Sequence, residues 1–286
     1  RSMPTANWCV PARHAVVGRK REQQELRAAL QWVGSGRGLI CSVVGEPGIG
    51  KSTLVEEFLN GMTAAGQWLI GRGRCSERLA GTEAYLPVLG ALESLLQRGS
   101  HPGLSASMQQ LAPAWYAQVA PLAESGGDTA KLLNGGLAIS QDRLKRELGL
   151  FLQEAAQARP LLLFLDDLHW ADVSTIDILT YLASYFDSLR LLIVVTYRPS
   201  DMLLARHPFL QIKPDLQARG VLRELQVGFL DSAEIGQYLN LEFPGHRFPV
   251  AFPRLIQAKT EGSPLFMADV IRYLRDRGVI AQTDGA

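Results

Sequence analysis

The sequence has few of the residues that build metal centres or disulfide frameworks. Its 286 residues include 3 cysteines and 5 histidines, and Cys9, Cys41 and Cys75 are widely separated. A structural zinc site needs closely spaced cysteine and histidine ligands, and a disulfide framework needs more cysteines than are present. We therefore expect reduced thiols, as in a cytoplasmic protein.

Long apolar runs and an excess of one charge are also missing. The longest apolar runs, near residues 161–165 and 191–195, are far shorter than the ~20 residues that span a bilayer. Lys+Arg 29 and Asp+Glu 28 leave a net charge of +1, which gives no global argument for nucleic-acid binding. No charged-then-apolar secretory segment opens the chain, and its first three residues, Arg1-Ser2-Met3, are typical of a cut end or a cloning remnant. We expect a cytoplasmic location, no membrane partner and no direct nucleic-acid binding.

Short apolar segments alternate with helical patterns from about residue 38. This alternation favours an α/β fold with a parallel sheet flanked by helices. Helical spacing of apolar residues predicts helices from Lys51, over 142–158 and over 173–186, whereas the composition of 99–140 favours short helices joined by loops. Five strands are predicted, at 38–44, 68–71, 161–165, 191–195 and 221–227.

Only helices are predicted after residue 230. Asp231 with Glu234 three residues later resembles a capping box for a helix through residue 239. A second helix is predicted over 252–260. A third begins at Ser263-Pro264, which gives a cap followed by a proline at the first helical position.

These patterns divide the chain into three parts. We expect an N-terminal extension over 1–13, an α/β core over 14–229 that contains a five-stranded parallel sheet, and a small all-helical lid subdomain over 230–286.

The segment GEPGIGKS, residues 45–52, is the strongest motif. It fits G-x-x-x-x-G-K-[ST] and lies between an apolar segment and a helical one. Glycines let backbone N–H groups turn toward phosphate oxygens, Lys51 supplies a cation for the β- and γ-phosphates, and the Ser52 hydroxyl is a ligand for Mg²⁺. The predicted phosphate site comprises Gly45, Glu46, Pro47, Gly48, Ile49, Gly50, Lys51, Ser52 and Thr53. The motif therefore predicts that the core over 14–229 is a nucleotide-binding α/β domain of the P-loop NTPase type.

The segment LLLFLDDLHWAD, residues 161–172, ends an apolar run with two adjacent carboxylates. Such a pair can share a metal, divide acid and base work, or mark the surface end of a buried strand. The phosphate motif upstream favours a site, with Asp166 as the Mg²⁺ ligand and Asp167 as the group that orients or deprotonates the attacking water.

Asp167 occupies a position where many energy-coupled ATPases carry glutamate. Aspartate is shorter by about 1.5 Å. A displacement of that order can cost ~10²-fold in rate. We therefore expect slow hydrolysis.

Three further side chains of these segments need an interpretation. His169 and Trp170 have no second histidine or cysteine nearby, so supporting roles are favoured over metal ligation. Asp172 is the expected cap of the next helix. In LLIVVTYRP, Arg198 follows an apolar strand, and its guanidinium can grip a terminal phosphate and so distinguish ATP from ADP.

Five segments in order resemble the STAND-class signalling ATPases. They are VVGRKRE at 16–22, GEPGIGKS, LLLFLDDLHWAD, TYRP at 196–199 and EGSP at 261–264. These proteins are AAA+-related switches of large bacterial regulators and of modules fused to cyclases or kinases. The resemblance covers about residues 14–280.

The resemblance implies roles that the chemistry of the residues alone does not assign. Val16, Val17 and Arg19 would contact the base and phosphates of ATP or ADP. Pro264, in the Gly-Ser-Pro of the helical lid, would pack against the base from the other side. Arg198 corresponds to the γ-phosphate sensor of the family.

The chain also departs from the family pattern. Members usually continue into a winged-helix domain and a repeat or sensor region with an effector, and we expect these parts to be missing partners. No cis arginine finger is evident. Arg219 lies near the place of a trans-acting one, although a solvated surface arginine is the favoured interpretation.

The favoured hypothesis is an ATP/ADP switch in a larger signal-transduction regulator. ADP would keep it closed, ATP sensed by Arg198 would open it and permit homo-oligomerisation, and slow Mg²⁺-dependent ATP hydrolysis, with Lys51 and Asp167 taking part, would reset it. An alternative is an AAA+ nucleic-acid remodeller or initiator ATPase, which would need a basic surface and a trans arginine finger. A third, less favoured hypothesis is a P-loop kinase, for which no acceptor site is visible.

Overall fold

The structure, a computed structural model, describes residues 17–63, 66–79, 84–97, 102–120 and 140–280. The described residues form two compact units: a core unit, residues 21–228, and a helical unit, residues 17–20 with 229–280. The sequence places the division one residue later and assigns residues 14–20 to the core. Residues 17–20 instead cluster with the helical unit, where Gly18 lies against the side chain of Glu234.

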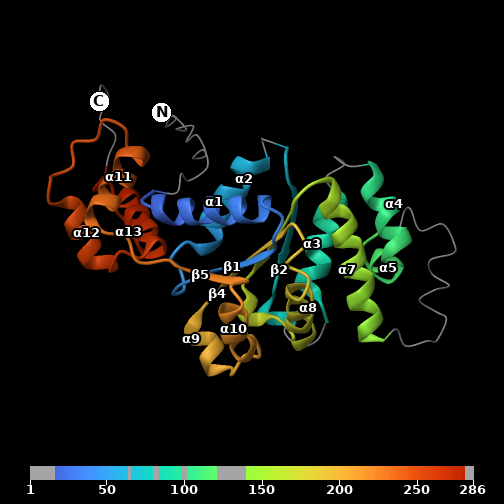
Figure 1. Ribbon diagram of the computed structural model, residues 1–286. Helices are drawn as coiled ribbons and strands as arrows, with labels where there is room; N and C mark the ends of the chain where they lie inside the picture. Colours follow the sequence, from blue (N-terminus) through green and yellow to red (C-terminus); the bar gives the residue numbers. More distant parts are fainter. Residues whose placement is uncertain (1–16, 64–65, 80–83, 98–101, 121–139, 281–286) are drawn as a thin grey trace, which may run out of the picture. The chain divides into compact units, whose positions relative to one another are not determined.

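The core unit is built on a parallel sheet in the order β2-β3-β4-β1-β5 (Figure 1). Its strands are β1 (Leu39–Val44), β2 (Leu69–Arg74), β3 (Leu161–Asp166), β4 (Leu191–Tyr197) and β5 (Leu222–Gln226). All five predicted strands are confirmed. Strand β2 runs three residues beyond the predicted end, and Arg74 therefore lies opposite Asp166 in the ladder with β3.

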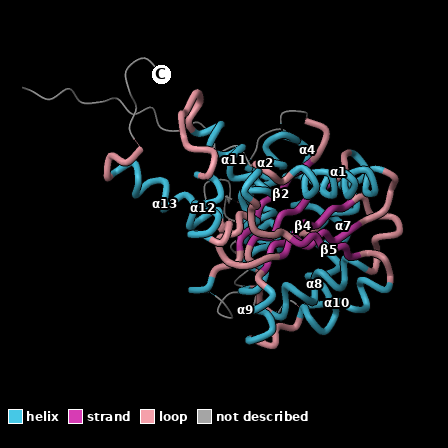
Figure 2. The backbone as a smooth tube through the Cα atoms, turned by 90° about the vertical axis from the view of Figure 1, so that its left-hand side faces the viewer, coloured by secondary structure: helices cyan, strands magenta, loops and turns pink. Residues whose placement is uncertain are grey.

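Helices cover both faces of this sheet, which explains why β1, β3 and β4 are buried at every residue. Figure 2 shows α1 and α2 on one side of the strands and α8 and α10 on the other. Residues of α3, α7, α8 and α10 join one hydrophobic cluster with side chains from β3 and β4. The bounds are α1 (Lys20–Gly34), α2 (Lys51–Thr63), α3 (Leu86–Gln97), α7 (Gln141–Ala158), α8 (Val173–Ala183) and α10 (Phe209–Ala218).

The shorter elements lie between these layers in the chain. They are η1 (Glu77–Leu79), α4 (Pro102–Leu111), α5 (Pro113–Val119), η2 (Leu168–Trp170) and α9 (Pro199–Leu204). The short helices predicted for 99–140 are present as α4 and α5, and residues 121–139 lie outside the described part. Among the described helices none is both long and apolar enough to cross a membrane.

The predicted helix over 173–186 is too long at its end. Helix α8 stops at Ala183, where the Ser184 hydroxyl donates a hydrogen bond to the Tyr181 carbonyl at 2.6 Å. A serine that bonds the preceding turn competes with the helical backbone pattern. Asp172 caps the start of α8 as predicted, accepting from the Thr175 amide at 3.0 Å.

The helical unit contains α11 (Ser232–Glu242), α12 (Phe252–Thr260) and α13 (Pro264–Asp276). The predicted capping box is confirmed: Asp231 accepts from the Glu234 amide at 2.8 Å, and Glu234 accepts from the Asp231 amide at 2.9 Å. The unit has a hydrophobic core of its own, formed by Leu230, Ile235, Leu239, Ile256, Met267 and Ile271. These six side chains form a cluster separate from that of the core unit.

Candidate active site

The loop between β1 and α2 has the backbone shape that binds an anion. Gly48 and Gly50 adopt positive φ angles of 73° and 90°. A side chain would strain both positions, so glycine is required for the turn that points N–H groups inward. The exposed Glu46, Pro47 and Thr53 and the buried Ile49 lie in the same segment. The loop leads directly into the N-terminus of α2, which favours negative charge.

Lys51 spans this loop with its ammonium group. Its Nζ donates to the carbonyls of Gly45 at 2.8 Å and Glu46 at 3.0 Å. The residue is only 6% exposed. Burial lowers the pKa of Lys51, and the nearby positive charge of Arg198 lowers it further. Two cations thus lie close together beside a loop shaped for an anion.

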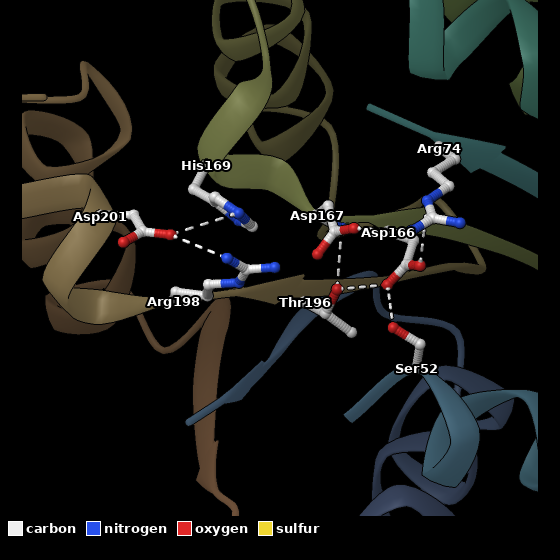
Figure 3. A network of polar contacts seen from close by, with 8 residues as sticks. All are labelled: Ser52, Arg74, Asp166, Asp167, His169, Thr196, Arg198 and Asp201. Carbon is white, nitrogen blue, oxygen red and sulfur yellow. Dashed lines mark hydrogen bonds and ion pairs between the residues drawn. The ribbon is translucent and has the colours of Figure 1, made fainter. Parts of the chain in front are cut away.

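Asp166 lies at the carboxyl edge of the sheet, where three strands bring their ends together. One of its carboxylate oxygens, Oδ1, accepts from Ser52 Oγ at 2.7 Å and from Thr196 Oγ1 at 2.6 Å (Figure 3). Strand β4 lies between β1 and β3, which explains why Thr196 reaches Asp166. Ligands of open α/β sheets bind at this edge.

The pair Ser52 and Asp166 fits a magnesium ion. Mg²⁺ prefers hard oxygen donors, keeps several waters, and binds through one or two carboxylates together with substrate phosphates. A hydroxyl and a carboxylate that lie 2.7 Å apart at the end of the phosphate loop supply that donor set. Among the described residues there is no cluster of three or more His, Cys, Asp or Glu side chains that could hold a metal without a phosphate.

Asp167 follows Asp166 directly and adopts the left-handed backbone conformation. Its φ of 58° is uncommon for a residue with a side chain, and its amide donates to Thr196 Oγ1 at 2.8 Å. A backbone held in this region costs roughly 1–3 kcal/mol and is found most often at functional sites. The two carboxylates differ in their hydrogen bonds: Asp166 accepts from Ser52 at 2.7 Å, while Asp167 accepts from Arg74 at 3.2 Å.

Arg198 follows β4 and precedes α9. Its Nη1 lies 3.3 Å from Oδ2 of Asp201, and His169 Nε2 lies 3.6 Å from the same oxygen (Figure 3). Strand β4, which Arg198 follows, pairs with β3, the strand that ends in Asp166. Burial lowers the pKa of His169. Its ring lies 5.1 Å from the Trp170 ring, centroid to centroid.

Three side chains of this site were not assigned from the sequence. Thr196 and Asp201 lie within three residues of the predicted Arg198. The partners of Thr196 are about 30 positions away, at Asp166 and Asp167, and Asp201 also approaches the distant His169. Arg74 contacts Asp167, and its Nε lies 3.8 Å from Asp166 Oδ2. The sequence does show that Arg74 is a basic residue shortly after the predicted end of β2. Its contact with Asp167 could be predicted only by knowing that β2 pairs with β3.

The predicted base contacts lie in the helical unit or outside the described residues. Val16 is not described, Val17 is half-buried and Arg19 is buried. In the turn before α13, Gly262 has a φ of 79°, and a side chain there would meet the Leu230 carbonyl at 2.2 Å. Pro264 follows as the first residue of α13. Base binding by these residues stays a prediction.

Arg219 is held at the end of α10. Its Nη2 donates to the Ala183 carbonyl at 2.9 Å, and its Nη1 lies 3.6 Å from Asp215. The guanidinium therefore has partners within its own chain, and a trans-acting role stays a prediction.

The sequence matches one family model. Residues 15–195, more than half of the 286-residue chain, match the model described as an AAA ATPase domain. A comparison with curated proteins gives no match.

Several solved structures share the fold. A Walker-type ATPase of Pyrococcus abyssi has a TM-score of 0.51 and 18% identity, over 88% of this chain and 65% of that one. A STAND protein with a tetratricopeptide repeat sensor from Pyrococcus horikoshii has a TM-score of 0.52 and 18% identity, over 90% of this chain and 30% of that one. Drosophila ORC bound to DNA has a TM-score of 0.52 and 13% identity, over 95% of this chain and 59% of that one. The chain thus spans less than two thirds of each structure, and these identities carry the fold alone.

Proposed function

Since the chain belongs to the AAA ATPase domain family, we propose that it is an ATP/ADP-binding switch with slow Mg²⁺-dependent ATP hydrolysis, serving within a larger signal-transduction regulator. The observation that carries this proposal is the contact between Ser52 and Asp166, 2.7 Å apart at the end of the phosphate loop. Asp167 and Arg198 come directly after the neighbouring strands β3 and β4, on either side of this contact. In this proposal the site provides a phosphate-binding loop, two ligands for one Mg²⁺ ion, a general base and a γ-phosphate sensor.

Each side chain has a separate task in this proposal. Lys51 donates to the β- and γ-phosphate oxygens, in exchange for its present bonds to the loop carbonyls. Ser52 and Asp166 hold Mg²⁺, which when bound neutralises phosphate charge. Asp167 orients the attacking water and accepts its proton, while Arg198 binds the terminal phosphate.

Slow turnover follows from the placement of Asp167. Its short side chain begins from a strained turn and accepts a hydrogen bond from Arg74. That hydrogen bond competes with the attacking water for the carboxylate. Water activation is therefore slow, as suits a timer that resets a signal.

The helical unit would act as the lid. Bound ADP would hold the switch closed, and Val16, Val17, Arg19 and Pro264 would contact its base. A γ-phosphate bound by Arg198 would favour the open state, since a charge added at such a site can bias a two-state arrangement. A larger regulator with winged-helix, repeat-sensor and effector regions, a cytoplasmic location and nucleotide-dependent homo-oligomers belong to the same proposal.

The test begins with nucleotide binding. Isothermal titration with ADP, ATP and GTP in the presence of Mg²⁺ should give micromolar affinity for the adenine nucleotides and clearly weaker GTP binding. Lys51→Ala should weaken binding at least about tenfold, because it removes charge-assisted hydrogen bonds worth roughly 1.5–3 kcal/mol each. The matched control is Lys145→Ala, which removes a lysine of α7 paired with Asp177 of α8. Equal binding by both variants would contradict the proposed phosphate site.

Hydrolysis is tested separately. Asp167→Asn should retain nucleotide affinity and lower the turnover of ATP by about 10²-fold or more, since general bases contribute typically 10²–10⁴-fold. Release of phosphate under single-turnover conditions is the measurement. Unchanged turnover would remove Asp167 from the mechanism.

A further inference from the structure

One carboxylate oxygen of Asp201 lies between two nitrogen-bearing side chains from different segments. Arg198 Nη1 is 3.3 Å away and His169 Nε2 is 3.6 Å away (Figure 3). Arg198 and Asp201 flank the start of α9, whereas His169 belongs to η2, two residues after Asp167. Asp201 therefore joins the segment of the proposed sensor to the segment of the proposed base.

The two contacts are not equivalent. The distance to Arg198 is within hydrogen-bond range, whereas neither ring nitrogen of His169 has a hydrogen-bond partner within the described part of the chain. The side chain of His169 is 0% exposed. Buried polar atoms are nearly always hydrogen-bonded. His169 thus offers a buried donor that no acceptor uses in this state.

The backbone around these side chains is held in place by other contacts. His207, which follows α9, has its Nδ1 3.3 Å from the Phe209 amide and its Nε2 3.0 Å from the Ala171 carbonyl. Since Nδ1 accepts, Nε2 carries the proton and donates to the chain after η2. Met202 of α9 is fully buried. With both segments anchored, side-chain rotation is the available way to change partners.

A terminal phosphate would compete with Asp201 for Arg198. Guanidinium groups bind phosphate bidentately. The Arg198 side chain is one third exposed, and it lies close enough to Lys51 to lower the pKa of that lysine. Departure of Arg198 would leave the Asp201 carboxylate facing an unused donor. A shift of about 0.7 Å would bring His169 Nε2 from 3.6 Å to hydrogen-bond distance.

We propose that Asp201 is a positioning residue that exchanges Arg198 for His169 when a γ-phosphate binds. In the empty and ADP states Asp201 holds the guanidinium of Arg198. In the ATP state Arg198 binds the phosphate, and Asp201 accepts a hydrogen bond from His169. The inference rests on the proposed role of Arg198 as the γ-phosphate sensor, and it adds the residues that determine how strongly ATP is preferred.

The test compares the affinities for ADP and for a non-hydrolysable ATP analogue, both with Mg²⁺. Asp201→Asn keeps the shape but weakens the hold on Arg198, so affinity for the analogue should rise about tenfold with ADP affinity unchanged. His169→Phe should lower affinity for the analogue severalfold and leave ADP binding unchanged. The matched control, Asp215→Asn, breaks the similar pair with Arg219 in α10 and should leave both affinities unchanged.

A second measurement observes His169 in the wild-type chain, and a variant is needed only to assign its signals. The imidazole nitrogens of His169 are followed by ¹⁵N NMR, with His169→Phe used for assignment. An Nε2–H proton protected from exchange should be observed with the ATP analogue and be absent with ADP.

The outcomes separate this inference from the function on which it rests. Arg198→Ala should abolish the preference for the ATP analogue, and adding Asp201→Asn to that variant should have no further effect. If Arg198→Ala keeps the preference, the proposed sensor is wrong. If it loses the preference but Asp201→Asn behaves as wild type and the imidazole does not respond, the exchange alone is overturned. A change in both affinities by the same factor would make Asp201 merely structural and would also overturn it.

Discussion

The hydroxyl of Thr196 connects the two acidic residues of the site. It donates to Asp166 at 2.6 Å and accepts from the Asp167 amide at 2.8 Å, and the residue is fully buried. Thr196→Val keeps the shape but leaves the partly buried Asp167 amide without its acceptor and the buried Asp166 carboxylate without one of its donors, and an unsatisfied polar group of this kind costs roughly 1–3 kcal/mol. We expect a loss of about 2 kcal/mol in the free energy of unfolding and weaker Mg²⁺ dependence of nucleotide binding. Urea denaturation and Mg²⁺ titrations of ADP affinity measure the two effects.

Thr196→Ser is the matched control, because it keeps the hydroxyl and removes only a methyl group. It should retain most of the stability and the Mg²⁺ dependence. If the valine and serine variants behaved alike in both measurements, the hydroxyl would not hold the carboxylates.

The residues of the site differ in how far the sequence could predict them. Lys51 and Ser52 follow from a local motif, and Asp166 from an acid that ends an apolar strand, and the structure brings Ser52 and Asp166 together. The contacts of Thr196 and Arg74 depend on which strands are neighbours and in which register. Thr196 is 30 positions from Asp166, and Arg74 is 93 positions from Asp167. Residues this far apart become neighbours only in the folded sheet, so local sequence patterns could not predict these contacts.

At the scale of elements, the packing of α3 on β2 depends on a glycine. A side chain at Gly73 would lie 1.7 Å from the Pro87 carbonyl at the start of α3. A backbone oxygen cannot rotate away, so Gly73→Ala must displace the helix or the strand. Overpacking of this kind typically costs about 1–3 kcal/mol. We expect a loss at the upper end of that range in the free energy of unfolding, measured by urea denaturation.

Gly61→Ala provides the matched comparison. Gly61 lies inside α2, and a side chain there would meet nothing within 4 Å. Alanine is favoured over glycine in helices by up to about 1 kcal/mol. The same substitution should therefore stabilise the chain at position 61 and destabilise it at position 73. Similar effects at the two positions would contradict the close contact of α3 with β2.

The sequence predicted the strands better than the helices. Strands β1, β3 and β4 are buried at every residue, and each appears in the sequence as a continuous apolar run. Strands β2 and β5 contain polar residues, and the predicted end of β2 came three residues too early. Helix α1 was not predicted, although its buried residues Leu26, Ala29 and Val33 recur at helical spacing. Helix α3 was missed because it is apolar on several sides, which hides the helical period.

At the scale of the whole molecule, the sequence predicted an α/β unit and a helical unit, but it did not predict every residue that belongs to each. The end of the strands and the start of the capped helices indicate the change from sheet to helical unit near residue 229. The grouping of residues 17–20 with residues 229–280 depends on contacts between segments more than 200 positions apart. Local periodicity carries no information about such contacts.

Buried histidines make the stability of the chain depend on pH. Burial lowers the pKa values of His207 and His169 from the ordinary value of 6.5. A group whose pKa is lower in the folded state takes up its proton more readily when the chain unfolds. The free energy of unfolding should therefore be greatest above about pH 6.5 and fall as the pH decreases below it, by at most about 1.4 kcal/mol per pH unit for each such histidine.

His207→Gln tests this dependence, because glutamine keeps an amide donor for the Ala171 carbonyl and does not titrate. The free energy of unfolding of both chains is measured by urea denaturation from pH 7.5 to 5.5, with tryptophan fluorescence as the probe. Carboxylates contribute equally in both chains, so the difference between the two curves isolates His207. We expect the wild type to lose more stability than the variant as the pH falls, with the two curves converging toward acid. Parallel curves would show that His207 takes up its proton as readily in the folded chain as in the unfolded one, and burial would not govern its charge.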